Sequence, residues 1–211
     1  MNALKLSVKS LAIAFSSLMF TGLALAAPLT VSGVVKSQNP LPANLRVGVF
    51  LTDRSGNPSK EFSSASVTNS AYTLNIAEIV PPSTALQSLV QDILDWSGLI
   101  GKISITGTAH IARTTIRTYL DANNDKSFSS GDTLFESFVT KGRGSIVIVY
   151  SDAKTRIKAD RGFDATLEPG WNLLQIELGN PIKVSRVSSV EAVQIEVLGT
   201  PGYVVSYSLG F

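Results

Sequence analysis

The chain has 211 residues, of which 18 are Lys or Arg, 16 are Asp or Glu and none is Cys. The absence of Cys excludes disulfide bonds, cysteine metal sites and a lipid anchor attached through Cys. The near balance of charge argues against a nucleic-acid-binding protein, which needs a concentrated basic surface. The length is sufficient to bury a core in one large domain or two small ones.

Residues 1–26 have the pattern of a secretory signal peptide. Lys5 and Lys9 precede an apolar run from Leu11 to Leu25, and the sequence Ala24-Leu25-Ala26 forms an A-x-A cleavage signal. Cleavage after Ala26 would remove two of the 18 basic residues and leave 16 against 16 acidic ones. We therefore expect an exported protein, periplasmic, on the cell surface or extracellular, without a transmembrane span after signal cleavage.

Residues 27–211 are expected to form an all-β fold, an antiparallel β-sandwich. Short segments of alternating or β-branched residues are separated by Gly, Pro, Asn and Asp, which is typical of a sandwich. The expected strands cover residues 30–35, 45–51, 71–76, 102–112, 114–120, 133–139, 146–150, 171–178, 190–198 and 203–209.

One short amphipathic helix is expected over residues 83–95. Ser83 can cap it after two prolines, Gly98 can end it, and one apolar face recurs at helical spacing, formed by Leu86, Leu89, Val90, Ile93 and Leu94. The acidic residues of this segment favour packing on the sandwich over membrane-surface binding, with docking of a partner as the alternative. Two small sub-domains could meet near residues 83–101.

The segment Asp121–Asp132 contains oxygen-bearing residues at the spacing of a calcium loop. The expected ligands are Asp121, Asn123, Asp125, the carbonyl of Ser127, Ser129 (directly or through water) and Asp132. The alternative is a solvated turn without a bound ion, because Asp, Asn, Ser and Gly are the residues that turns favour. Phe128 is expected to point back into the protein. Strand-like arms on both sides indicate that an ion here would fasten two strands together.

This loop resembles the calcium loop of the EF-hand family, and more closely the D-x-N-x-D loops of secreted bacterial proteins that lack flanking helices. It departs from the EF-hand pattern at two positions: Lys126 stands where Gly is usual, and Asp132 stands where the last ligand is usually Glu. The resemblance implies calcium as the bound ion.

The sequence contains no pattern that indicates an enzyme. The lone histidine, His110, lies on the polar side of its expected strand, and the chain has no G-x-S-x-G motif to support a Ser-His-Asp triad. We expect His110 to be a surface or hydrogen-bonded residue. The basic residues Lys154, Arg156 and Lys158 alternate along one strand face, which indicates a solvated face or a patch for acidic glycans or lipid headgroups.

The turn Pro169-Gly170-Trp171-Asn172, together with Tyr150-Ser151-Asp152, is similar to the last strands of secreted bacterial sandwiches. On these residues the chain resembles transthyretin-like and carboxypeptidase-regulatory-like modules. The resemblance implies a non-enzymatic module for binding, adhesion or cell-envelope structure, with a calcium ion and an envelope glycan or protein as partners.

A second interpretation comes from the end of the chain. Alternate apolar residues from Tyr203 to Phe211 are typical of the C-terminal strand of a small outer-membrane β-barrel. Such a barrel needs an apolar outward face on every strand, which these short strands do not supply. The sandwich is therefore the favoured interpretation and the barrel is the alternative.

Overall fold

The computed structural model describes residues 28–76 and 78–198, and it confirms an all-β fold. The strands are β1 (Leu29–Lys36), β2 (Leu45–Thr52), β3 (Pro58–Ser66), β4 (Ala71–Ile76), β5 (Gln87–Ser88), β6 (Ser104–Thr106), β7 (His110–Leu120), β8 (Thr133–Thr140), β9 (Gly144–Ser151), β10 (Thr155–Lys158), β11 (Asp164–Leu167), β12 (Gly170–Glu177), β13 (Lys183–Val187) and β14 (Ser189–Leu198). Three short 3₁₀ helices, η1 (Ser83–Ala85), η2 (Gln91–Ile93) and η3 (Asp160–Gly162), join some of them.

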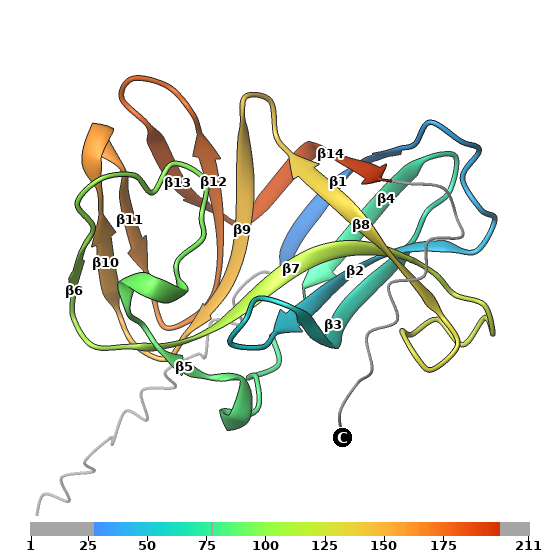
Figure 1. Ribbon diagram of the computed structural model, residues 1–211, viewed down its shortest axis with the longest axis horizontal. Helices are drawn as coiled ribbons and strands as arrows, with labels where there is room; N and C mark the ends of the chain where they lie inside the picture. Colours follow the sequence, from blue (N-terminus) through green and yellow to red (C-terminus); the bar gives the residue numbers. More distant parts are fainter. Residues whose placement is uncertain (1–27, 77, 199–211) are drawn as a thin grey trace, which may run out of the picture.

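Strand β7 connects the two halves of the molecule (Figure 1). The large sheet runs in the order β13-β12-β9-β7-β8-β14-β1-β4, and β2 pairs with β7 and carries β3 along its other edge. A small sheet, β11-β10-β6, lies beside β12 and β13. Because β7 pairs with β2, β5, β8 and β9, it is held along its whole length and can position residues at both of its ends.

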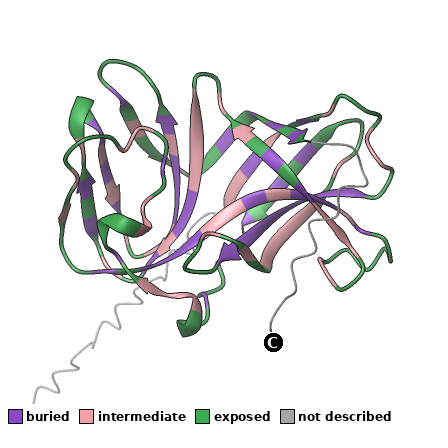
Figure 2. Ribbon diagram, viewed as in Figure 1, coloured by how far each residue is buried: buried purple, intermediate pink, exposed green. Residues whose placement is uncertain are grey.

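Two clusters of buried apolar side chains fill the halves. The first includes Val31, Val47, Leu74, Val193 and Ile195, and the second includes Ile111, Ile157, Leu167, Leu174 and Ile176, all 0–1% exposed. In Figure 2 buried residues alternate with exposed ones along most outer strands, whereas β2 is buried throughout. This matches a layered sheet protein in which β2 lies between two covered faces.

One strand pair is parallel, which the sequence did not predict. β1 pairs with β4 on one side in antiparallel fashion and with β14 on the other side in parallel fashion, with a register shift between Val31 and Gly33. Gly33 is required at this shift because a Cβ there would overlap the backbone of Val193. β1 is thereby placed one position inside the sheet, between the edge strand β4 and the last described strand, β14.

The helix expected over residues 83–95 is wrong. The segment contains only the single turns η1 and η2, with β5 between them pairing along the start of β7. Leu89 donates its N–H to Ala109 O at 2.9 Å and is buried, as is Trp96. The apolar residues at helical spacing belong here to an irregular segment that packs on the second cluster. An isolated helix of this length is only marginally stable, and the edge of β7 offers the segment hydrogen bonds instead.

Two expectations lie outside the described residues: the signal peptide over residues 1–26 and the terminal strand over residues 203–209. Within the described ranges, no helix combines the length and the apolar character that crossing a membrane requires. The division into two sub-domains near residues 83–101 stays a prediction. The segment itself contributes Leu89 and Trp96 to the second cluster.

Candidate metal centre

The loop from Asp121 to Asp132 joins the end of β7 to the start of β8, at the lower right of Figure 1. It begins where β7 leaves the core, and Asp121 is fixed there because its N–H donates to Asn44 O at 3.1 Å. The two strands pair directly behind the loop, with Leu120 opposite Thr133. The expectation that two strands flank the loop is therefore confirmed.

Three carboxylates of this loop converge on one point. One oxygen from each of Asp121, Asp125 and Asp132 lies within 4.8 Å of the others. Asp121 is only 3% exposed, and its Oδ1 is buried without a hydrogen-bond partner. An ionised carboxylate oxygen in that position is costly unless it is paired with a donor or a cation. The acidic triad can therefore hold a metal ion.

The backbone of the loop wraps around the first carboxylate. Lys126 donates its N–H to Asp121 Oδ2 at 3.0 Å, and this places Lys126 in the left-handed region at φ 68°. Asn124 is also left-handed, at φ 59°. The turn normally made by Gly at position 6 is thus made here by a lysine, at some cost in strain.

The other expected ligands lie close to the triad. Asn123 Oδ1 accepts the N–H of Asp125 at 3.0 Å, and its amide nitrogen lies 2.8 Å from Asp125 Oδ2 and 3.1 Å from Ser129 Oγ. Ser129 donates its N–H and its hydroxyl to Asp132 Oδ2, at 2.7 and 3.2 Å. Ser127 donates its N–H to Asp125 Oδ1 at 2.8 Å. Their roles as ligands stay predictions.

Hydrogen bonds keep Asp125 in its charged form. The N–H of Ser127 and the amide of Asn123 lower the pKa of the Asp125 carboxyl below its usual value of 3.8. Asp132 Oδ1 also accepts a backbone N–H, from Ala122 at 2.8 Å. The loop therefore presents anionic oxygens at neutral pH, which is the form that a hard cation requires.

Phe128 points back into the protein, as expected, and packs on two aromatic rings. Its ring centroid lies 5.3 Å from that of Phe50 and 5.4 Å from that of Tyr119, both in edge-to-face geometry. Its N–H donates to Glu61 Oε2, which also accepts the hydroxyl of Tyr119 at 3.0 Å. The loop is thus docked on strand β3 as well as on β7 and β8.

A buried arginine extends this docking. Arg46 on β2 donates its Nε–H to Tyr119 Oη at 3.1 Å and its two terminal nitrogens to Ser66 and Ser64, at 2.8 and 2.9 Å. Ser64 in turn donates to Lys126 O at 3.3 Å. Burial of Tyr119 raises its pKa to about 12, so its hydroxyl stays a donor to Glu61. Sequence inspection missed Glu61, Ser64 and Arg46, because nothing in their local pattern connects them to a loop 60 residues away.

The other candidate residues form ordinary polar pairs. His110 Nδ1 lies 2.8 Å from Asp152 Oδ2, and its N–H donates to Asp152 Oδ1 at 2.7 Å. The hydrogen-bonded histidine is thus as expected. Basic residues of β10 and of the position just before it form ion pairs with carboxylates. Lys154 pairs with Glu168 at 2.7 Å, and Arg156 pairs with Asp164 at 2.5 Å. This pairing fits a solvated face better than an anion-binding patch.

The chain matches no protein-family model, no curated protein and no solved structure.

Proposed function

We propose that this protein is an exported, non-enzymatic β-sandwich that binds calcium in the loop Asp121–Asp132 and serves as a binding, adhesion or cell-envelope structural module. The observation that carries the calcium proposal is the buried, unpartnered Oδ1 of Asp121 inside a cluster of three carboxylates. Calcium suits the donor set because it takes six to eight oxygen ligands in a flexible cage. Magnesium demands stricter octahedral geometry, which a loop of this length and composition supplies less readily.

The ion would act as a structural fastener. Without a cation, three carboxylates within 4.8 Å repel one another at the point where β7 and β8 leave the sheet. With calcium, the same oxygens would become ligands, and the centre of the loop would be closed beside its existing contacts with Glu61 and Ser64 of β3. The rigidity gained at this end of the sandwich supports a role in which the protein acts as a stable structural unit, as in adhesion or envelope structure.

Export is supported by the signal-like residues 1–26, and the function as a module by the resemblance to secreted sandwiches. The partner proposed for it is an envelope glycan or another envelope protein.

A thermal melt of the purified protein in EDTA and in millimolar calcium tests the proposal. At a calcium concentration one hundred times Kd, binding would add about 2.7 kcal/mol, or a rise in Tm of about 5–10 °C. Magnesium should give a smaller rise. Asp125→Ala should remove most of the calcium-dependent rise.

The matched control is Asp152→Ala. It removes a surface carboxylate that accepts two hydrogen bonds, against three for Asp125, but lies outside the loop, and it should keep the whole calcium-dependent rise. Equal loss of the rise in both variants, or no rise in the unmodified protein, would contradict the calcium site.

A further inference from the structure

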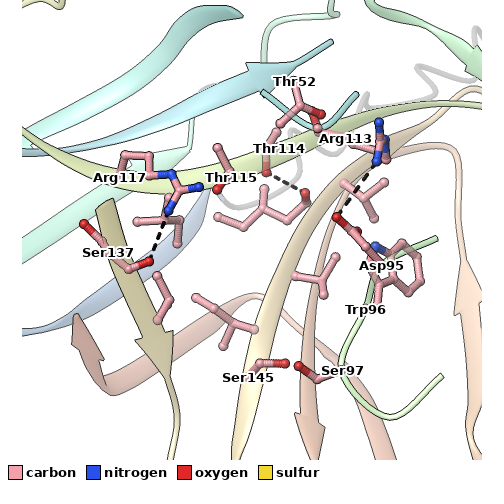
Figure 3. Close-up of a pocket in the computed structure, with 17 residues that line it drawn as sticks. Thr52, Asp95, Trp96, Ser97, Arg113, Thr114, Thr115, Arg117, Ser137 and Ser145 are labelled. Carbon is pink, nitrogen blue, oxygen red and sulfur yellow. Dashed lines mark hydrogen bonds and ion pairs between the residues drawn. The ribbon is translucent and has the colours of Figure 1, made fainter. Parts of the chain in front are cut away.

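Strands β7, β8 and β9 surround an opening in the large sheet (Figure 3). β8 pairs with β7 only through Thr118–Leu120, and β9 pairs with β7 only through Ile111–Arg113. β8 and β9 meet again in a single bridge between Lys141 and Gly144. The middle parts of the three strands therefore diverge, and they enclose a hollow of about 280 Å³.

Two strand edges face each other across this hollow. Lys141 and Gly144 exchange both backbone hydrogen bonds, each at 3.0 Å, so their N–H and C=O groups point toward the opposite strand. Since strand residues two apart direct these groups to the same side, Val139 and Ile146 direct theirs into the hollow. In the described sheet pairings, neither Val139 nor Ile146 has a ladder partner on that side.

Side chains of β7 satisfy the carbonyls at two corners of the opening. Thr114 donates its hydroxyl to Ile148 O at 2.7 Å, and Arg117 donates Nη1–H to Ser137 O at 3.3 Å. Both contacts are drawn in Figure 3, one on each side of the hollow. These contacts confirm that the edges of β8 and β9 point inward. The backbone groups of Val139 and Ile146 between them need water or a ligand as a partner.

Arg117 brings a positive charge that no carboxylate of the described residues neutralises. Its one hydrogen bond goes to an uncharged carbonyl, and it takes part in none of the ion pairs found in the described ranges. Arg113, two positions before Thr115 on the same face of β7, differs in this respect. Its terminal nitrogens donate to three backbone carbonyls, of Ile93, Asp53 and Arg54, at 2.9–3.1 Å, and Asp95 lies 3.9 Å away.

The rest of the lining is mixed. Hydroxyl groups come from Thr115, Ser97 and Ser145, and hydrocarbon side chains come from strands β8 and β9. Ser145 Oγ is buried without a partner. Asp95 also lines the hollow, but its carboxylate is exposed and lies 3.9 Å from Arg113, which leaves the charge of Arg117 for a ligand. A cation, backbone donors, backbone acceptors and hydrocarbon in one small hollow match a compact molecule with a carboxylate, several hydroxyl groups and an apolar ring face.

We propose that the opening between β7, β8 and β9 binds a small sugar acid, with the guanidinium of Arg117 holding its carboxylate. The sugar hydroxyls would donate to the carbonyls of Val139 and Ile146 and accept from their N–H groups. A volume of about 280 Å³ lies just below the range of about 300–1,000 Å³ for ligand sites, which suits a single sugar ring. This site is separate from the calcium loop and does not depend on it.

The test is a titration of the purified protein with D-glucuronate, D-glucose and sodium sulfate at equal ionic strength, in EDTA and again in calcium. Backbone amide shifts are followed by NMR, and affinities by calorimetry. We expect D-glucuronate to shift the amides of Val139 and Ile146 to saturation in both buffers, and D-glucose and sulfate to bind at least tenfold more weakly.

Variants at Arg117 sharpen the result. Arg117→Met keeps most of the hydrocarbon stem and should weaken D-glucuronate binding by at least about tenfold, the effect of one lost charge-assisted hydrogen bond. Arg117→Lys keeps the charge, should fold if the methionine variant does not, and should retain the preference for D-glucuronate over D-glucose. Arg186→Met, at an exposed arginine of β13, is the control and should bind as the unmodified protein does.

Equal binding of D-glucose would show a neutral-sugar site, and equal binding of sulfate would show a simple anion site. Each of these two results would overturn the proposal. It would also be overturned if the amide shifts were confined to residues outside the opening, or if no saturable binding were observed.

Discussion

Two turns of this protein are rich in Asp and Asn, but their carboxylates are arranged differently. The turn after β2 is closed by Asp53, whose Oδ1 accepts the N–H of Asn57 at 2.8 Å and whose Oδ2 accepts the amide of Asn57 at 3.2 Å. Both oxygens of this exposed carboxylate are thus satisfied within the turn. The loop after β7 brings three carboxylates together and leaves Asp121 Oδ1 buried and unpartnered.

This difference separates an ordinary turn from a candidate ion site when both are rich in Asp and Asn. Composition and turn chemistry are shared. What separates them is whether the carboxylate oxygens find enough donors within their own segment. The turn at Asp53 does so with one asparagine, whereas the loop at Asp121 supplies donors to five of the six carboxylate oxygens of its triad and leaves the buried Asp121 Oδ1 without one.

The largest effect is expected for Asp121→Asn, which removes the unpartnered anionic oxygen and so makes the loop resemble the turn at Asp53. Asparagine can still accept the N–H of Lys126, so the variant should fold, and in EDTA it should be no less stable because repulsion with Asp125 and Asp132 is relieved. In calcium it should lose most of the stabilisation of about 2.7 kcal/mol expected at one hundred times Kd.

Paired melts in EDTA and calcium measure this effect, with Asp53→Asn as the matched control. The control should lose some stability in both buffers and keep the full calcium-dependent rise. A calcium response that survives in Asp121→Asn would show that the two turns are alike.

A smaller effect is expected for Glu61→Ala, which leaves the loop sequence unchanged but removes one of its two attachments to β3, the other being the contact of Ser64 with Lys126 O. The N–H of Phe128 and the hydroxyl of Tyr119 would lose their shared acceptor, at a cost of about 1–3 kcal/mol in the free energy of unfolding. The calcium affinity should also fall several-fold, because the unbound loop would sample more conformations.

Urea unfolding in EDTA gives the stability change, and competition with a chromophoric chelator gives the calcium affinity. Glu136→Ala removes an exposed glutamate of β8 and should change neither quantity. If Glu61→Ala leaves the calcium affinity unaltered, the contacts of Glu61 contribute only to the stability of the fold and not to ion binding.

The smallest effect is expected for Lys126→Gly, which makes the loop more like the usual calcium pattern with Gly at position 6. Glycine adopts φ 68° without the penalty of about 1 kcal/mol that a side chain incurs, and it removes one positive charge from the loop. Calcium affinity, measured by chelator competition, should rise by about tenfold or less. Asn124→Gly is the control, because asparagine tolerates its left-handed conformation and little should change. A weaker affinity in Lys126→Gly would show that the lysine contributes to the site.

The sequence was sufficient for the all-β class and for the convergence of Asp121, Asp125 and Asp132, because both follow from local spacing. It was insufficient for the dock on Glu61, which lies 67 residues from Phe128 and meets it only through the pairing of β2 with β3 and β7. The opening at Arg117 likewise depends on where β8 and β9 part from β7. The expected helix failed because the spacing from Leu86 to Leu94 also suits an irregular cover.

The parallel pairing of β1 with β14 bears on how this chain can fold. Thr30 lies opposite Ser189 and Lys36 lies opposite Glu196, so this contact closes a loop of about 160 residues. Loop-closure entropy delays such contacts, and proteins dominated by them fold slowly. Until β14 is in place, β1 and β8 each lack a neighbour, and unpaired edges of this kind invite association with other chains. A newly synthesised chain must therefore pass through a stage in which β1 is formed before its partner β14 is available.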